Sequence, residues 1–311
     1  MSVVLGVDGG GTKTHAVITD ETGRILGEGL GGPTNIDDHD LETATVHLET
    51  AVNQARAHAQ LKTEPFDAAF LGIAGVVSAA DHALVRKFAR RLELTRPNPT
   101  GPDPLGVDHD ARVALAGGLS GRPGMVLIAG TGSACFGMNA AGERHLAGGW
   151  GHLLADEGSG YWLGLEALRA AVRGFDGRGQ PTLLEHRVLD FLGVHAPEEM
   201  MHRLYVIGLS RAELAAFGPT TLEVAASGDG VARAIVRRGA TALVDTVEAT
   251  AGRLNLVASE VVLVGGVLRS ELMLELLRKQ LAMRLPQTSL VEAEHSPAYG
   301  ACLLAQTLLP I

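Results

Sequence analysis

The chain has 311 residues, a length that suggests two domains, and 46% of them are hydrophobic while only 4% are aromatic. With 40 glycines as well, this composition indicates a compact α/β protein and excludes a disordered chain. The formal net charge of −9 argues against nonspecific nucleic-acid binding. No stretch approaches the roughly 20 apolar residues that a membrane helix needs, so we expect no membrane partner.

Two cysteines, Cys135 and Cys302, lie far apart in apolar surroundings. They form no C-x-x-C pair, so the chain offers no framework for a zinc knuckle or an iron–sulfur cluster. Two isolated thiols fit a reducing compartment. The first residues carry neither a basic segment nor a long apolar run, and we therefore expect a cytoplasmic protein.

The first third of the chain predicts alternating strands and helices, beginning with an antiparallel meander of three strands. A proline-rich stretch at 95–104 predicts a surface loop. The expected strands are 3–7, 15–19, 24–29, 68–73 and 105–107, and the expected helices are 41–61 and 82–92.

The second part opens in the same way, with a buried strand that enters a glycine turn. The expected strands are 125–129, 134–138, 144–146, 261–264 and 288–291. The expected helices are 161–172, 182–192, a broken helical stretch to about 217, 231–257, 270–283 and 299–308.

Strand–glycine turn–strand units therefore open both halves, which predicts a duplicated fold. We expect an N-terminal lobe over residues 1–117, a C-terminal lobe over 118–311, and a ligand cleft between them, since ligands favour such crevices. The last helix is expected to pack back on the N-terminal lobe.

The first candidate site is Asp8-Gly9-Gly10-Gly11-Thr12-Lys13-Thr14, between two strands. Three consecutive glycines let bare N–H groups approach an anion, and the strand-end carboxylate of Asp8 is placed to hold Mg²⁺ through water. An ordinary hairpin turn needs fewer glycines. The order Gly-Thr-Lys-Thr departs from the P-loop, and Thr14 stands where the dinucleotide-binding motif ends in glycine.

Two further glycine turns follow strands. Gly130-Thr131-Gly132-Ser133 repeats the strand–turn–strand arrangement and gains weight from the first turn, since two such turns can clamp a polyphosphate. Gly265-Gly266 lies between a strand and a helix, where either a nucleoside or close packing explains the glycines equally well.

In order, the segments VLGVDGGGTKTHAVITD, LIAGTGSACFG and VVLVGGV resemble the phosphate-1, phosphate-2 and adenosine motifs of actin/hexokinase/Hsp70-type ATPases. The chain is similar to the N-acetylglucosamine kinase branch of the BadF/BadG/BcrA/BcrD family over essentially its whole length. The most specific match is the run Gly148–Gly160, supported by Pro33-Thr34-Asn35 and His109-Asp110-Ala111. The resemblance implies an α/β fold of the two-lobed, actin-like (duplicated ribonuclease H-like) type and an ATP- and Mg²⁺-dependent kinase.

The same resemblance implies a role for individual residues. Asp110 would be the general base, and the nucleotide would be bound by Asp8, Gly10, Gly11, Thr12, Lys13, Thr131, Gly132, Ala225, Gly265 and Gly266. The sugar would be bound by Asn35, Asp110, Ser133, Gly149, Trp150 and Asp156. A homodimer is also expected.

Asp110 has a physical argument of its own. A sugar hydroxyl is a poor nucleophile, and a nearby carboxylate can orient it and accept its proton. The alternatives are that Asp110 caps a helix or that Asp108 is the base. For Trp150 the alternative is a buried aromatic residue, whereas its glycine neighbours favour a sugar contact.

Ala134 and Ala74 stand where animal relatives carry Asn and Ser on the sugar side. N-acetylglucosamine, glucosamine and N-acetylmuramic acid therefore all stay open as acceptors, with the C6 hydroxyl as the expected site of transfer. One alternative function is an ATPase activator of a CoA-ester dehydratase or reductase, which needs accessible cysteines. Another is a nucleotide or sugar sensor without enzymatic activity.

Overall fold

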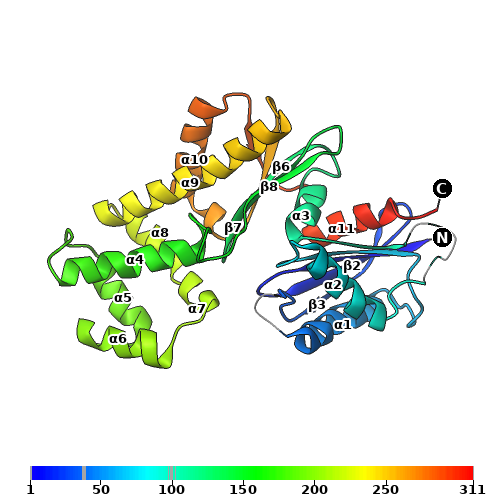
Figure 1. Ribbon diagram of the computed structural model, residues 1–311, viewed down its shortest axis with the longest axis horizontal. Coiled ribbons are helices and arrows are strands. Elements are labelled where there is room, and N and C mark those ends of the chain that lie inside the picture. Colours follow the sequence, from blue (N-terminus) through cyan, green and yellow to red (C-terminus); the bar gives the residue numbers. More distant parts are fainter. Residues whose placement is uncertain (1, 37–39, 97, 99–100, 102, 311) are drawn as a thin grey trace. The chain divides into compact units, whose positions relative to one another are not determined.

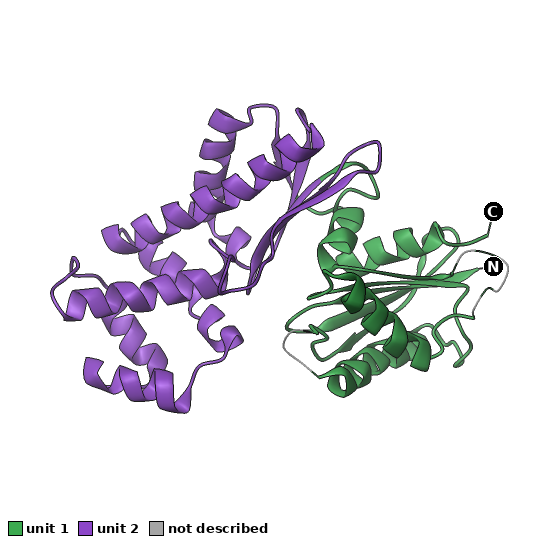
Figure 2. Ribbon diagram, in the orientation of Figure 1, with its two compact units in different colours: residues 1–124, 292–311 green, residues 125–291 purple. Residues whose placement is uncertain are grey.

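A computed structural model describes residues 2–36, 40–96, 98, 101 and 103–310. The chain divides into two compact units, which Figure 2 colours separately. Unit 1 comprises Met1–Gly124 and Glu292–Ile311, and unit 2 comprises Met125–Val291. The division expected after residue 117 falls inside helix α3 (Asp110–Gly118), and the observed one lies after that helix.

Unit 1 is built from five strands and four helices among the described residues (Figure 1). The strands are β1 (Val3–Gly9), β2 (Thr14–Asp20), β3 (Ile25–Gly31), β4 (Ala68–Ile73) and β5 (Leu105–Asp108). The helices are α1 (Leu41–His58), α2 (Ala79–Arg91), α3 (Asp110–Gly118) and α11 (Pro297–Gln306).

The sheet of unit 1 has the order β3-β2-β1-β4-β5. β1 is antiparallel to β2 and parallel to β4, which in turn is parallel to β5. This register aligns Asp8 with Gly72 and Gly72 with Asp108 across the three parallel strands. The carboxyl ends of β1, β4 and β5 therefore share one edge of the sheet, the usual place for a ligand in an α/β protein.

Alternation along β1 divides the apolar side chains between the two faces of the sheet. Leu5 and Val7 belong to the same buried cluster as residues of α1, whereas Val4 belongs to the cluster that contains Ala298 and Cys302 of α11. Helix α11 lies so close to β1 that a β-carbon on Gly6 would stand 2.3 Å from Ala298 O. The last helix thus packs on the sheet of unit 1.

Unit 2 contains five strands and seven α-helices among its residues, with short turns of other helix types. The strands are β6 (Gly124–Ala129, its first residue counted in unit 1), β7 (Ser133–Met138), β8 (Arg144–Gly148), β9 (Glu260–Val264) and β10 (Ser289–Val291). The α-helices are α4 (Gly160–Phe175), α5 (Leu184–Leu192), α6 (Met200–His202), α7 (Arg211–Ala215), α8 (Gly218–Ala226), α9 (Gly230–Leu254) and α10 (Glu271–Arg284), of which α6 is a single turn continuous with its neighbours. Those neighbours are 3₁₀ turn η1 (Pro197–Glu199) and π-helical turn η2 (Arg203–Ile207), and a second 3₁₀ turn, η3 (Val267–Arg269), precedes α10.

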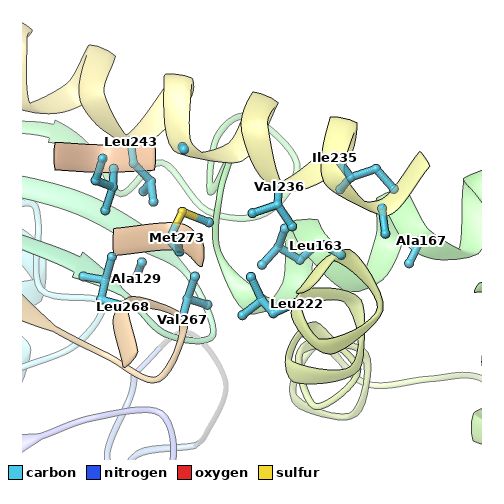
Figure 3. Packing of buried hydrophobic residues seen from close by; sticks show 14 of the residues in the cluster. Ala129, Leu163, Ala167, Leu222, Ile235, Val236, Leu243, Val267, Leu268 and Met273 are labelled. Carbon is cyan, nitrogen blue, oxygen red and sulfur yellow. The ribbon is translucent and has the colours of Figure 1, made fainter. Parts of the chain in front are cut away.

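The sheet of unit 2 has the order β10-β9-β6-β7-β8, which is the order of unit 1 with each strand replaced by its counterpart. β6 runs parallel to β9 and β9 parallel to β10, while β7 is antiparallel to β8. Figure 3 shows Val236 and Leu243 of α9 in one packed cluster with Leu163, Val267 and other apolar side chains. The predicted duplication is confirmed.

Every strand and long helix expected from the sequence is present, with ends that differ by at most three residues. Helix α8, however, was not expected, and the broken helical stretch proves to contain a π-helical turn, 203–207. The proline-rich loop 95–104 includes residues outside the described part of the chain. No helix among the described residues is long and apolar enough to span a membrane.

Candidate active site

In unit 1, the glycine-rich segment forms the tip of the β1–β2 hairpin. Gly10 N donates to Lys13 O at 3.0 Å, and Gly11, Thr12 and Lys13 are exposed. The tip therefore presents backbone N–H groups and a lysine to solvent, an arrangement suited to an anion such as a phosphate.

The segment that carries Asn35 is fastened to this hairpin. Thr34 N donates to Gly10 O at 3.1 Å, and Thr34 Oγ1 lies 3.0 Å from Thr14 Oγ1. Gly9 has no room for a side chain, because a β-carbon there would lie 2.1 Å from Thr34 Oγ1. Asn35 is consequently held beside the hairpin: its Nδ2 would be 3.9 Å from a β-carbon on Gly11.

Asp8 and Asp110 approach each other at the same edge of the sheet. Burial, together with repulsion by Asp110 and despite attraction by Lys13, raises the pKa of Asp8 from its ordinary 3.8 to about 7. Burial also raises the pKa of Asp110. Two neighbouring carboxyl groups with raised pKa values are typical of acid–base and metal-binding sites.

Asp108 and Asp110 have different surroundings. Arg112 Nη1 donates to Asp108 Oδ2, and this bond and the charge of His109 outweigh burial, so the pKa of Asp108 is lowered. The residue that caps α3 is His109, whose Nδ1 accepts from Arg112 N at 3.2 Å. The alternative that Asp110 is the helix cap is thus wrong, because Asp110 is the first helical residue.

In unit 2, the glycine turn after β6 is braced by the start of α4. Gly160 N donates to Gly130 O at 2.8 Å, and Tyr161 N donates to Thr131 O at 3.3 Å. The turn also holds the glycine-rich run, since Gly149 N donates to Ser133 O at 3.1 Å. Gly149 itself has a φ of +72°, a conformation that glycine adopts without strain.

Asp156 lies behind this turn with its side chain buried. Its Oδ1 accepts from Ser133 N at 2.9 Å, and its Oδ2 accepts from Arg211 Nη2 at 2.8 Å. Both oxygens therefore have a partner within unit 2, and the expected sugar contact of Asp156 stays a prediction.

The Gly265-Gly266 turn lies directly beside the Gly130 turn. A β-carbon on Gly265, whose φ is +116°, would stand 2.3 Å from Ala129 O and 2.9 Å from Gly130 N. Gly266, by contrast, faces open space. The parallel pairing of β6 with β9 brings the two turns to one edge of the sheet, so Gly265 serves close packing and Gly266 is free to approach a ligand.

Ala225 and Trp150, two of the residues expected to contact a ligand, differ in their exposure to solvent. Ala225 is fully buried inside α8, so its methyl group reaches no solvent, and the next exposed residues are Ala226, Ser227 and Gly228. Trp150 is 69% exposed, which excludes the alternative of a buried aromatic residue. Leu153 and Leu154 in the same run are exposed as well.

Each unit thus assembles its own share of the expected site. Unit 1 brings together Asp8, Gly10, Gly11, Thr12, Lys13, Asn35 and Asp110. Unit 2 gathers Thr131, Gly132, Ser133, Gly149, Asp156, Gly265 and Gly266, while Ala225 lies inside a helix. Sequence reasoning missed the contacts of His109, Arg112 and Arg211; only the i, i+4 spacing of Asp108 and Arg112 was a usable signal.

No cluster of three or more His, Cys, Asp or Glu side chains suited to a metal is present in the described part of the chain. A divalent cation at Asp8 would therefore need oxygen ligands from a bound molecule or from water. Mg²⁺ fits such a site, because it usually keeps several waters and takes few protein carboxylates. The repulsion between Asp8 and Asp110 also favours a cation between or beside them.

Two α/β units with the same strand order, each with a glycine turn after its first strand, define the duplicated fold of actin-like ATPases. The model of the BadF/BadG/BcrA/BcrD ATPase family matches residues 5–305, and the chain belongs to that family.

Three similar proteins align with almost the whole chain. The N-acetylmuramic acid/N-acetylglucosamine kinase of Clostridium acetobutylicum is 32% identical over 310 residues, 99% of each chain. The N-acetyl-D-glucosamine kinase of Dictyostelium discoideum is 30% identical over 316 aligned positions, 97% of each chain. The crystal structure of a candidate N-acetylglucosamine kinase from Chromobacterium violaceum has a TM-score of 0.77 and 28% identity, covering 98% of this chain and 99% of that one.

Proposed function

We propose that this protein is an ATP-dependent amino sugar kinase, which transfers the γ-phosphate of ATP to a hydroxyl of N-acetylglucosamine, N-acetylmuramic acid or glucosamine. The observation that carries the proposal is the pairing of Asp8 and Asp110 beside the glycine hairpin of unit 1. Full-length similarity to two amino sugar kinases supports it.

In the proposed reaction, Asp110 accepts the proton of the sugar hydroxyl as its oxygen attacks the γ-phosphorus. The bond from that phosphorus to the β–γ bridging oxygen breaks, and ADP leaves. Asp108 is less suited to this role because it is ion-paired with Arg112. Asn35, held beside the hairpin, is suited to fix sugar hydroxyls by hydrogen bonds.

The glycine turns at 10–13 and 130–133 are proposed to bind phosphates of ATP through backbone N–H groups, and Gly266 to border the adenosine. Mg²⁺ would be held by Asp8 through water and would neutralise phosphate charge. A C6 acceptor hydroxyl, a cytoplasmic location and a homodimer remain predictions from the sequence.

For the acceptor, we favour N-acetylmuramic acid and N-acetylglucosamine. The first of the relatives above is named for both sugars, and small side chains at Ala74 and Ala134 leave room where animal relatives carry larger polar groups. Ala74 lies next to the site: its N donates to Gly9 O at 2.8 Å, and its O accepts from Ile36 N.

The alternative of a dehydratase activator is not supported by the cysteines. Cys135 and Cys302 are buried, and burial raises the pKa of each thiol to about 12. Since the thiolate is the metal ligand, neither residue suits an iron–sulfur cluster.

The test is ADP release from Mg-ATP over a panel of glucose, glucosamine, N-acetylglucosamine and N-acetylmuramic acid. We expect turnover with at least one amino sugar above that with glucose. Asp110→Asn is expected to lower kcat by roughly 10²–10⁴-fold while ADP binding persists. Failure of all amino sugars would refute the function, and full activity of Asp110→Asn would refute the role of Asp110.

A further inference from the structure

Arg211 is connected to the second glycine turn through one carboxylate. It is the first residue of α7, and its Nη2 donates to Asp156 Oδ2 at 2.8 Å. The other oxygen of Asp156 accepts from Ser133 N at 2.9 Å. The guanidinium group thus reaches the backbone of the turn in two hydrogen-bonded steps, across 78 residues of sequence between Ser133 and Arg211 (211 − 133 = 78).

The contacts around this pair are tight. The side chain of Asp156 is 3% exposed and that of Arg211 is 22% exposed. A β-carbon on Gly132 would lie 2.7 Å from Arg211 Nη2 and 2.8 Å from Asp156 Oδ1. Gly132 of the turn therefore packs directly on both charged groups. A displacement of either group would change the packing of the turn.

The ion pair with Arg211 offsets the unfavourable free energy of two features of Asp156, its backbone conformation and its burial. Its φ of +68° lies in the left-handed region, which residues other than glycine adopt only at an energetic cost. A buried carboxylate also needs a partner that compensates for its lost hydration. Arg211 is the cation that supplies it, while Ser133 N supplies only a neutral donor.

Helix α7 holds Arg211 firmly although the helix is short. Its N-terminus is closed by a capping box of Ser210 and Glu213. Its other end packs on α4: a β-carbon on Gly164 would lie 2.3 Å from Leu214 O, and one on Gly160 would lie 3.0 Å from Ala215 O and 3.1 Å from Gly130 O. The same glycine thus touches α7 and the turn, so α7, α4 and the turn form one packed assembly.

We propose that Arg211 is a positioning residue for the nucleotide: through Asp156 it sets the direction of the Ser133 N–H and the shape of the 130–133 turn. The inference rests on the proposed function, in which this turn binds phosphates. It assigns to Asp156 a duty toward nucleotide, separate from any contact with sugar.

The experiment compares Arg211→Met, which keeps an apolar stem but removes the charge, with Arg211→Lys and with Arg187→Met. Arg187 is an exposed arginine of unit 2 that lies 3.4 Å from Glu223 and serves as the control. The measured quantities are the Kd for ADP without sugar, KM for ATP, KM for sugar, kcat and Tm.

We expect Arg211→Met to raise the Kd for ADP and KM for ATP by about 10-fold or more, since it leaves a buried charge unpaired. KM for the sugar should change less than about threefold, Arg211→Lys should restore part of the ADP affinity, and Arg187→Met should match the wild type.

Unchanged ADP affinity in folded Arg211→Met would overturn the proposal, and so would a rise confined to KM for the sugar. Should Arg211→Met fail to fold, Arg211→Gln, which keeps a donor, provides the same comparison. Wild-type protein that binds ADP without phosphorylating any sugar would refute the kinase function, whereas the Kd comparison would still decide the role of Arg211.

Discussion

Asp108 and Asp110 are two residues apart, yet their surroundings give their carboxyl groups opposite properties. Arg112, one helical turn after Asp108, lowers the pKa of Asp108, whereas burial raises the pKa of Asp110. Separated pKa values in neighbouring carboxyl groups are a recurring way to assign different roles to them. Here they favour Asp110 for proton transfer and Asp108 for holding α3.

Asp8 predicts how the stability of the ligand-free protein depends on pH. Its folded-state pKa, about 7, lies above the ordinary 3.8, so the folded state binds more protons between these values. The free energy of unfolding should therefore fall as pH rises from about 4 to 7. Asp8→Asn should remove that loss and raise the free energy of unfolding at pH 8 by on the order of 2 kcal/mol. Denaturant titration near pH 4 and at pH 8 measures the difference.

Asp20 offers a control of opposite sign. Hydrogen bonds from Thr22, together with contacts to Arg24, lower the pKa of Asp20. Asp20→Asn should therefore destabilise the protein at pH 8 and matter less near pH 3. If Asp8→Asn lost stability at pH 8 as Asp20→Asn does, burial and the charge of Asp110 would not raise the pKa of Asp8.

At the residue scale, the sequence predicted the groups that stand at strand ends and in glycine turns. Asp8, Gly10 and Asp110 fall in short segments whose local order predicts these positions. The ion pair between Arg211 and Asp156 could not be predicted from the sequence, because Arg211 lies in a broken helical stretch that gives no periodic signal. Burial of Ala225 was missed for the related reason that α8 itself was missed.

Among the elements, the turn after β9 contains a matched pair of glycines. Gly265 has a φ of +116° and no space for a β-carbon, whereas Gly266 has a φ of −66° and faces open space. Gly265→Ala should cost about 2 kcal/mol or more of stability. Gly266→Ala should leave Tm nearly unchanged but raise KM for ATP, because its methyl group would meet a bound nucleoside.

Thermal unfolding and ATP titration of both variants check this pair. Equal loss of stability in the two variants would mean that the turn is packed on both sides. Unchanged KM for ATP in Gly266→Ala would remove Gly266 from the nucleotide site.

Elements with clear periodicity were predicted well, and those without it were not. Strands β1, β4 and β6 are continuous apolar runs, and α1 repeats its alanines and leucines at helical spacing. Helix α8, by contrast, is short and starts with Gly218 and Pro219. Its buried residues follow helical spacing, but Gly218 and Thr221 are among them, so the apolar residues alone give no recognisable helical period.

For the whole molecule, the order of the chain has a consequence for stability. Unit 2 is one continuous segment, whereas unit 1 needs residues from both ends of the chain. Removal of residues 292–311 takes away α11 and uncovers Val4, Val17 and Phe70 on one face of the unit 1 sheet. Hydrogen exchange should then show loss of protection in residues 2–124 and retained protection in 125–291.

A synthetic peptide of residues 292–311 supplies the control, since its addition should restore protection of unit 1. Full protection of residues 2–124 in the truncated chain would show that α11 contributes little. Loss of protection throughout would show instead that unit 2 depends on unit 1.

The interrupted layout of unit 1 also sets an order of events at the ribosome. Strands β1 to β5 emerge first but wait for α11, which is translated after the entire unit 2. Gly6 of β1 and Gly117 of α3 let α11 pack directly against their backbones, and α3 alone covers only part of the same sheet face. The nascent N-terminal half therefore keeps part of this apolar face uncovered while unit 2 completes its own core, which makes this stage the one at which a chaperone has most to protect.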